Sequence, residues 1–404
     1  MNLRCFGSIA ATLLLALPAH ADTVALVASH SFPGARPGEV VTVSFDELSR
    51  VLPAAGMYNL SIKDPKGRAL AYQVTNYEHD HRGRDYDDLV FSYDFAPGES
   101  TAQFSIEIAQ SVQQPLPPCA YARAVPERYD DFAWENDRIA HRVYGPALNS
   151  EVAGRERLRS SGIDIWAKRV PYPIIDRWYA KGHDQFHKDE EGEGLDLYSI
   201  GTSRGAGGLG IWDGSKLWTS DNYSSARVLS NGPRRVAFEL NYSSWPAGDA
   251  AEASESRRVV LDCGSQFNAV ESRFNASGDA SIVGIGITVH PALEGFSAPK
   301  LSAGADGRWL SNWEEGPHGG LGVAVILDPA SDPSGTATET GAQGGNSNYL
   351  LLTKVTSNAP LKYLTGFGWS GAGQFRNKEE WEAHVKLTYE RWRNPLKISL
   401  RAVN

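Results

Sequence analysis

The sequence predicts a mostly β protein, with a small N-terminal β-sandwich, a larger antiparallel sandwich after it and a helix near the C-terminus. Short runs in which apolar and polar residues alternate recur along the chain, for example at 40–45 and 162–167. Glycine, proline, asparagine and aspartate separate these runs. A period of two residues is typical of strands with one buried face, and the spacing of the runs favours stacked antiparallel strands.

One segment near the C-terminus departs from this alternation. Large apolar residues recur with helical spacing between 378 and 391. Asn377, followed three residues later by Glu380, resembles a capping box at the start of a helix. We expect a helix over this segment that ends at Asn394-Pro395, and a final strand over 396–400.

The first residues have the order of a secretory signal peptide. One basic residue, Arg4, precedes an apolar run over 9–17, and small residues end at Ala21. We therefore expect residues 1–21 to be removed after Ala21, and the protein to be periplasmic or secreted. No later stretch approaches the roughly 20 apolar residues of a membrane span, so none is expected.

The rest of the chain divides at a proline-rich stretch. We expect a small β-sandwich domain over 22–115, a linker over 116–124 and a large β-sandwich domain over 125–404. A Gly/Ser/Thr-rich tract at 334–348 is expected to be a surface loop.

Composition restricts the partners of the protein. The net charge is −9 and basic residues form no stripe, so nucleic acid is not an expected partner. Eleven Trp and sixteen Tyr favour either sugar stacking or an aromatic-rich core. The cysteines of the mature chain, Cys119 and Cys263, form either a disulfide or two unpaired thiols.

Two motifs resemble known sites without their context. Residues 201–205 fit the nucleophile-elbow pattern, but a glycine-rich strand follows where that motif requires a helix. An acidic segment of the first domain offers oxygen ligands for calcium, although its spacing matches no standard loop and a solvated turn is the alternative. Its members are His79, Asp80, His81, Asp85, Asp87 and Asp88.

Residues 134–145 form the first of two segments rich in groups for acid–base chemistry. If residues 139–144 form a strand, His141 lies on one face, while Arg138 and Tyr144 lie on the other. Asn136 precedes this strand. The alternative is a solvated strand face with an ordinary salt bridge.

Residues 183–204 form the second segment, which combines histidines, carboxylates, a tyrosine and an arginine around glycines. Its candidate site residues are His187, Glu193, Asp196, Tyr198 and Arg204. His183 and His187 could also bind zinc with a carboxylate, but the flanking glycines disfavour the helix that such a site requires. The alternative is a charged surface loop.

Five runs along the chain resemble a known family. They are FAWENDRIAHRVYGPAL, SGIDIWAKRVPYPIIDRWY, HKDEEGEGLDLYSIGTSRGAGGLGIWDG, VLSNGPRRVAFELNYSSW and LKYLTGFGWSGAGQF. The sequence resembles the domain of unknown function 4861 family over nearly the whole mature chain. This resemblance implies a supersandwich similar to galactose mutarotase and polysaccharide lyases, among proteins that accompany pectin- and other uronate-degrading enzymes. Around His187 the chain departs from the expected pattern, since Phe186 stands in place of a tyrosine and Glu190 in place of a histidine.

The resemblance implies a uronate-directed lyase, with an isomerase or hydrolase on the same sugars, or a non-catalytic sugar-binding protein, as alternatives. A lyase neutralises the uronate carboxylate, removes the C5 proton and protonates the leaving oxygen. A mutarotase-like isomerase would pair His187 with Glu193. For the lyase we expect Asn136, Arg138 and Arg204 as the clamp, His187 and His141 as bases, and Tyr144 or Tyr198 as the acid, with Asp196 and Trp212 also contacting sugar.

Overall fold

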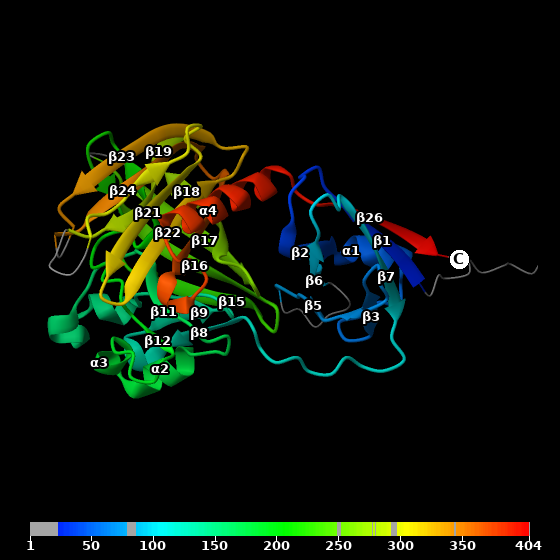
Figure 1. The fold of residues 1–404 in the computed structure, drawn as a ribbon. Coiled ribbons are helices and arrows are strands. Elements are labelled where there is room, and N and C mark those ends of the chain that lie inside the picture. Colours follow the sequence, from blue (N-terminus) through cyan, green and yellow to red (C-terminus); the bar gives the residue numbers. More distant parts are fainter. Residues whose placement is uncertain are drawn as a thin grey trace, which may run out of the picture.

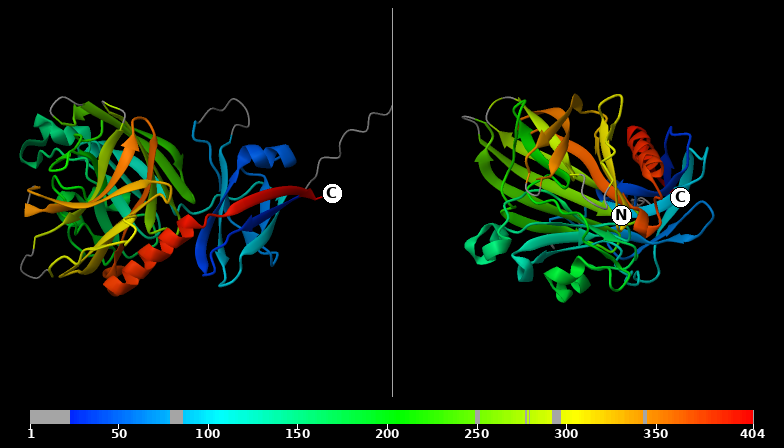
Figure 2. Two further views of the ribbon diagram at one scale, coloured as in Figure 1. Left: turned by 90° about the horizontal axis from the view of Figure 1, so that it is seen from above. Right: turned by 60° about the vertical axis from the view of Figure 1, so that its left-hand side comes forward.

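The computed structural model describes residues 23–78, 86–248, 252–276, 278, 280–291, 297–342 and 345–403. The described chain forms two units that lie side by side (Figures 1 and 2), both built mainly from antiparallel strands. The prediction of a mostly β fold with sandwich-like layers and a C-terminal helix is confirmed. The predicted signal peptide lies outside the described residues.

The N-terminal unit packs a five-stranded sheet against a three-stranded sheet. Alternation places Val24, Leu26 and Ala28 of the first strand in the core between the two sheets. The larger sheet, in spatial order, contains β26 (Lys397–Val403), β1 (Thr23–Ser29), β7 (Thr101–Ile108), β3 (Leu60–Lys63) and β4 (Ala69–Leu70). The smaller contains β2 (Arg36–Ser44), β6 (Asp88–Phe95) and β5 (Tyr72–Val74).

The second unit contains three sheets around one large hydrophobic core. The first sheet contains β12 (Gly194–Leu195), β11 (Asp164–Lys168), β10 (Ala140–Val143), β9 (Asp131–Glu135) and β8 (Tyr121–Val125). The second contains β14 (Leu217–Trp218), β13 (Ala206–Trp212), β19 (Ala280–Val289), β24 (Ser347–Thr356) and β23 (Asp332–Thr340). The third contains β15 (Ser225–Asn231), β16 (Arg235–Pro246), β17 (Glu252–Asp262), β18 (Phe267–Ala276), β25 (Pro360–Trp369), β22 (Gly319–Leu327), β21 (Trp309–Gly316) and β20 (Ser302–Ala303).

Among the residues that the structure describes, four α-helices accompany these sheets: α1 (Phe45–Val51), α2 (Ile175–Lys181), α3 (His183–Phe186) and α4 (Lys378–Arg393). The predicted C-terminal helix is α4, and the Asn377 side chain accepts a hydrogen bond from the Glu380 amide, 3.0 Å away. Its face with Trp381 and Val385 packs against β21 and β22. No helix in the described ranges is long and apolar enough to cross a membrane.

The structure differs from the expected boundaries at three places. β26 is the last strand in sequence, yet it pairs along its whole length with β1 of the N-terminal unit. Part of the expected linker is the strand β8, and Cys119, just before it, forms a disulfide with Cys263. The tract expected to be a loop is largely strand, because residues 334–340 belong to β23 and residues 347–348 to β24.

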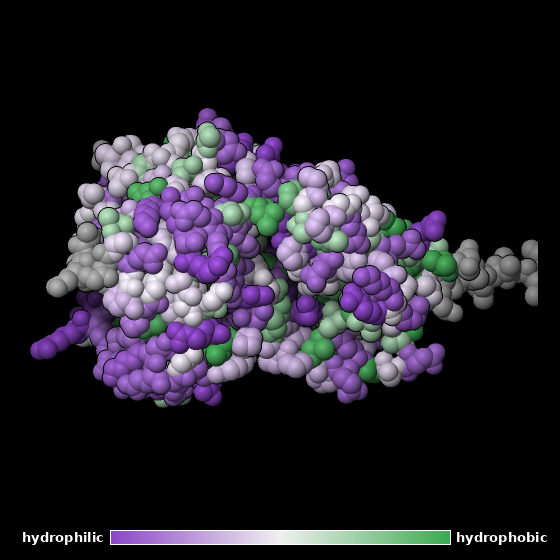
Figure 3. All heavy atoms as spheres, in the orientation of Figure 1, coloured by the Kyte–Doolittle hydropathy of each residue, from purple (hydrophilic) through white to green (hydrophobic). Residues whose placement is uncertain are grey.

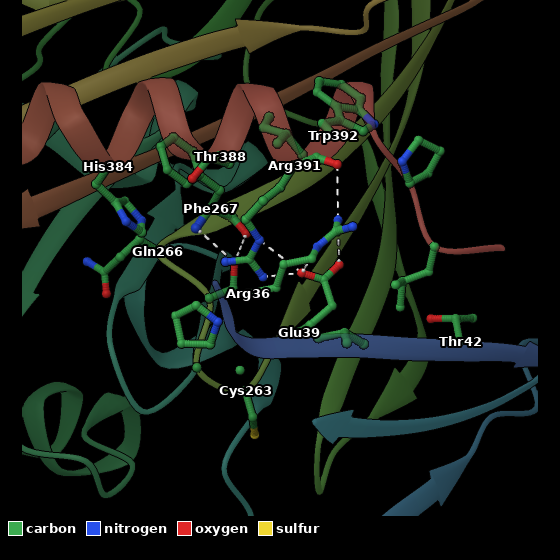
Figure 4. A pocket seen from close by; sticks show the side chains of 18 of the residues that line it. Arg36, Glu39, Thr42, Cys263, Gln266, Phe267, His384, Thr388, Arg391 and Trp392 are labelled. Atoms are coloured by element: carbon green, nitrogen blue, oxygen red, sulfur yellow. Dashed lines mark hydrogen bonds and ion pairs between the residues drawn. The ribbon is translucent and has the colours of Figure 1, made fainter. Parts of the chain in front are cut away.

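The two units are joined where α4 ends, beside a pocket of about 390 Å³ (Figure 4). Arg36 of β2 is buried there and donates hydrogen bonds to the backbone carbonyls of Asn394, at 2.7 Å, and Arg391, at 3.0 Å. Its Nε donates to Glu39, which also accepts hydrogen bonds from the Arg391 side chain. The N-terminal unit thus supplies partners for carbonyls that the end of a helix leaves free. On the face of the molecule seen in Figure 3, hydrophilic side chains cover much of the surface, and the surface is hollowed between the two units.

Replacing Arg36 tests this junction. Arg36→Met should lower the free energy of unfolding by about 2–4 kcal/mol, because Glu39 and the helix-end carbonyls lose a buried charged donor. Urea denaturation followed by tryptophan fluorescence measures the change. As a control, Arg50→Met removes an exposed pair with Asp46 and should cost less than about 1 kcal/mol. Equal effects of the two variants would contradict the assigned role of Arg36.

Candidate active site

Two adjacent hollows on the second unit form a cleft that contains four of the ten predicted site residues. The first, which we call the arginine hollow, has a volume of about 430 Å³, and the second, the histidine hollow, about 290 Å³. Residues 196–199 line both hollows, and we call this shared segment the ridge. His187 also lines both. His183 of α3 and Leu195 of β12 line the cleft, and Figure 1 labels both elements.

A buried arginine, Arg142, and two of the three carboxylates around it, Asp164 and Asp196, line the arginine hollow. Arg142 of β10 faces Asp164 of β11 in the strand register, and its Nε lies 2.8 Å from Asp164 Oδ2. Asp196 and Asp131 lie 3.3 Å and 3.6 Å from the same guanidinium. The Phe186 ring covers the guanidinium at 5.2 Å. We call these four charged residues the Arg142 cluster.

Burial governs the titration of the Arg142 cluster. Burial raises the pKa of Asp131 to about 6, against the opposing charge of Arg142. Burial and then the charge of Asp164 raise the pKa of Asp196 well above its ordinary value. Three carboxylates around one cation cannot all ionise cheaply in a site of low dielectric. Asp131 and Asp196 therefore retain protons at pH values where surface carboxylates are ionised.

His187 is the accessible imidazole at the ridge. It follows α3, and its Nδ1 lies 3.1 Å from the backbone carbonyl oxygen of Asp196, so Nδ1 carries the proton and donates it. Its side chain is 41% exposed, which leaves the Nε2 lone pair available to a ligand. Burial lowers the pKa of His187, and the charge of Arg142 adds to this effect. A neutral imidazole with a free Nε2 is suited to act as a base.

The two predicted tyrosines also line the arginine hollow. The Tyr144 hydroxyl donates to Asp164 Oδ2 at 3.3 Å, and the Tyr198 hydroxyl donates to the carbonyl oxygen of Thr288 at 3.1 Å. Burial raises both pKa values well above 10, so both hydroxyls keep their protons. Tyr144 is the candidate proton donor to a ligand, because it is 7% exposed and Tyr198 only 2%.

Three further arginines line the arginine hollow. Arg128 follows β8 and pairs with Glu156 at 2.6 Å. Two short 3-10 helices, Pro146–Asn149 and Glu151–Glu156, follow β10. Arg155 lies in the second of them, and Arg157 comes directly after it. Both are exposed, and neither has a carboxylate partner among the residues that the structure describes. These two guanidiniums are available to an anionic ligand.

An ion pair lies at the floor of the histidine hollow. His290, just after β19, contacts Glu314 Oε2 through Nδ1 at 2.7 Å and the Ser199 carbonyl oxygen through Nε2 at 2.9 Å. Burial alone would lower the pKa of His290, but the hydrogen bond and charge of Glu314 outweigh burial and raise it. Both nitrogens therefore act as donors, and the ring supports the ridge. His318 lines the exposed side of this hollow.

Two residues expected in catalysis lie outside the cleft. His141 is fully buried between the Asp164 carbonyl and the Asn268 side chain, 3.0 Å from each, and burial lowers its pKa to about 4. The Glu193 carboxylate is buried and accepts hydrogen bonds from Tyr172, Arg177 and Trp178. His141 is therefore a core residue, and Glu193 anchors α2 to the following loop, which corrects the expectation that both reach substrate.

Four of the expected sugar-binding residues also lie elsewhere. Asn136 is buried and binds four backbone groups around two turns. Arg138 is half exposed beside Asp137. Arg204 is buried against Ser161 and backbone carbonyls, and burial lowers its pKa to about 10. Trp212 packs at the end of β13. Of the expected binding set, Asp196 alone lines the cleft.

The proposed metal ligands have other partners where they are described. Most of the acidic segment considered for calcium lies outside the described residues, and Asp87 and Asp88 accept hydrogen bonds from Tyr77. Among described residues, one group has metal-ligand spacing, namely Cys119, Cys263 and Asp137. Its two sulfurs form the disulfide. His183 and His187 meet edge to face with ring centroids 5.0 Å apart. His183 lies in α3, although the flanking glycines were expected to disfavour a helix there.

Comparison with known proteins identifies the family. A model described as a domain of unknown function, DUF4861, matches residues 29–398. The chain belongs to this family. A further relative is the uncharacterized protein P7 of Formosa agariphila, which is 29% identical over 349 residues, covering 85% of each chain.

Solved structures show that this DUF4861 protein shares its fold with much larger chains. An α-mannosidase from Enterococcus faecalis V583 matches with a TM-score of 0.51 and 10% identity, over 96% of this chain and 47% of the mannosidase. A glycosyl hydrolase family 38 protein from Enterococcus faecalis matches with a TM-score of 0.50 and 10% identity, over 94% of this chain and 47% of that one. The chain therefore spans about half the length of either.

The Arg142 cluster should stabilise the fold more than any exposed ion pair. Arg142→Met should lower the free energy of unfolding by about 3–5 kcal/mol, because the variant leaves buried carboxylates without their cation. The control is Arg138→Met, which removes a half-exposed pair with Asp137 and should cost less than about 1 kcal/mol. Chemical denaturation of both variants measures the difference. A loss for Arg142→Met no larger than that of the control would show that the cluster is not stabilising.

The two cleft histidines should titrate on opposite sides of pH 6.5, the ordinary histidine value. Proton NMR of the ring hydrogens should show His187 losing its proton below that pH and His290 above it. Glu314→Gln should then lower the pKa of His290 and leave that of His187 nearly unchanged, because Glu314 contacts only the former ring. A pKa of His187 above 6.5 would exclude it as a neutral base in mildly acidic solution.

Proposed function

We propose that this protein acts on carbohydrate, as a lyase that cleaves uronate-containing oligosaccharides by β-elimination. The observation that carries the proposal is one hollow in which a neutral imidazole, His187, lies with two arginines that have no described carboxylate partner, Arg155 and Arg157. The folds of an α-mannosidase and a glycosyl hydrolase family 38 protein also support an action on sugars. Export through the predicted signal peptide would bring the protein to such substrates.

The chemistry requires a carboxylate clamp, a base and an acid. Arg155 and Arg157 would bind the uronate carboxylate and stabilise the negative charge that develops as the C5 proton leaves. The Nε2 lone pair of His187 would take this proton. The C4–O bond then breaks, the electron pair of the C5–H bond forms a C4–C5 double bond, and the leaving oxygen takes the proton of the Tyr144 hydroxyl. Solvent returns a proton from His187 to Tyr144 after each turnover.

The arrangement of the cleft favours the lyase over the mutarotase-like isomerase. The isomerase hypothesis pairs His187 with Glu193, but Glu193 is enclosed by Tyr172, Arg177 and Trp178 and does not line the cleft. A sugar-binding protein without activity requires no accessible base at the arginine hollow. A hydrolase would need two carboxyl groups on either side of the scissile bond, and the carboxyl groups of the arginine hollow instead pair with arginine side chains.

Replacing His187 tests the proposed base. His187→Ala should reduce the rate of product formation by about 10²- to 10⁴-fold on pectin- or alginate-derived oligosaccharides, because the variant removes the Nε2 lone pair that takes the C5 proton. The measurement is the ultraviolet absorbance of the unsaturated uronate. The melting temperature should change little, since the side chain is partly exposed.

Two controls separate the alternatives. Glu193→Gln should retain activity in proportion to its folded fraction, whereas an isomerase built on this carboxylate would lose its turnover. Proton NMR of the anomeric signals detects isomerisation directly. Wild-type protein that binds these oligosaccharides, as seen by a raised melting temperature, without any unsaturated product would contradict the lyase and favour the binding protein.

A further inference from the structure

The two hollows of the cleft differ in charge. The arginine hollow is lined by four arginines and three carboxylates. Among the described residues that line the histidine hollow, none is an arginine or lysine, while two are carboxylates, Asp196 and Glu314. A second anionic sugar would therefore find arginines in one hollow and, among the described lining residues, no arginine or lysine in the other.

The histidine hollow also has more apolar walls. Leu195, Leu197, Pro317 and Leu321 line it, together with the aromatic ring of Tyr198. The charge of Glu314 is already matched by His290, so neither group is free for a ligand carboxylate. An uncharged sugar can place its apolar ring face on such a surface and lose little hydration energy. A uronate would have to bury its carboxylate there without an unpaired arginine or lysine.

His187 lies at the boundary between these two environments. It lines both hollows, and in the ridge between them Leu197 is half-buried and Ser199 is exposed. A glycosidic bond that crosses the ridge would bring the sugars on its two sides into different hollows. In β-elimination the sugar that loses its C5 proton is the uronate, and the sugar that leaves through its own oxygen lies on the other side of the bond.

We propose that the cleft is built for a substrate in which a uronate is linked to an uncharged sugar, with the uronate in the arginine hollow and the uncharged sugar in the histidine hollow. This assignment of the cleavage direction rests on the proposed lyase function. Cleavage at the ridge then leaves the unsaturated uronate at the new non-reducing end and the uncharged sugar at the new reducing end. Chains made of uronate alone are poor substrates, because one carboxylate enters the hollow that is lined by no described arginine or lysine.

Matched oligosaccharides test the proposal. The probes are tetrasaccharides in which galacturonate or glucuronate alternates with a neutral sugar, and tetrasaccharides of the same uronate alone. For at least one of the two uronates, wild-type kcat/KM should be about tenfold or more higher for the alternating tetrasaccharide than for the uronate-only tetrasaccharide. Like charges without a cation between them oppose the binding of the uronate-only chain. Mass spectrometry of its products should find the neutral sugar at every new reducing end. A new uronate reducing end would overturn the proposal.

A charge introduced into the histidine hollow gives a sharper test. His318 lines this hollow on its exposed side, so His318→Arg adds a cation there without disturbing the core. His318→Arg should raise kcat/KM on the uronate-only chain. The ratio of kcat/KM for the alternating chain to kcat/KM for the uronate-only chain should therefore fall by about tenfold. His318→Gln, which removes the ring and adds no charge, should leave the preference nearly unchanged. Equal behaviour of the two variants would contradict the assignment of the hollows.

Binding distinguishes failure of this proposal from failure of the lyase. Calorimetry of His187→Ala with the same tetrasaccharides measures affinity without turnover. Tighter binding of an alternating chain, combined with no unsaturated product from the wild type, would support the two hollows and reject the lyase. Equal or tighter binding of the uronate-only chains would overturn the assignment of the hollows, whether or not the wild type is a lyase.

Discussion

The buried ion pair between Arg142 and Asp164 is the constraint on which the candidate site depends. It joins neighbouring strands of one sheet at directly opposed positions, and Asp196 brings the loop after β12 onto the same guanidinium. That loop is the ridge, and its carbonyl at Asp196 holds His187. Moving a charge into the protein interior is costly unless it is paired there. The requirement to pair Arg142 therefore fixes the backbone that positions the base and separates the two hollows.

Much of the fold could be predicted because it depends on local patterns. The alternation of apolar residues predicted the strands, and Asn377 with Glu380 marked the start of α4. The partner of the last strand could not be predicted, because β26 pairs with β1 across nearly the whole sequence.

The role of the aromatic residues could not be predicted either. Six tryptophans are among the largest fully buried side chains, so many of the aromatic residues belong to the hydrophobic core. Composition alone does not separate a core from a binding surface.

The candidate site was predicted in part. His187, Asp196, Tyr144 and Tyr198 belong to the segments that sequence reasoning selected, and they meet at the cleft. The alternation expected over residues 139–144 already separated His141 from Tyr144, and the structure shows that His141 is buried in the core. Arg155 and Arg157 were missed because they lie at a 3-10 helix outside both segments, where no periodic pattern indicates which way a side chain points. The alternating basic residues of 155–159 were the available signal.

The most direct measurement of the central claim is a crystal structure of His187→Ala with a bound uronate-containing oligosaccharide. The account predicts that a sugar carboxylate contacts Arg155 or Arg157, and that the C5 atom of that sugar lies over the space vacated by the imidazole. The chain should then cross the ridge beside Leu197 and Ser199. An oligosaccharide bound in the pocket between the two units, or with its carboxylate against Glu314, would contradict the account.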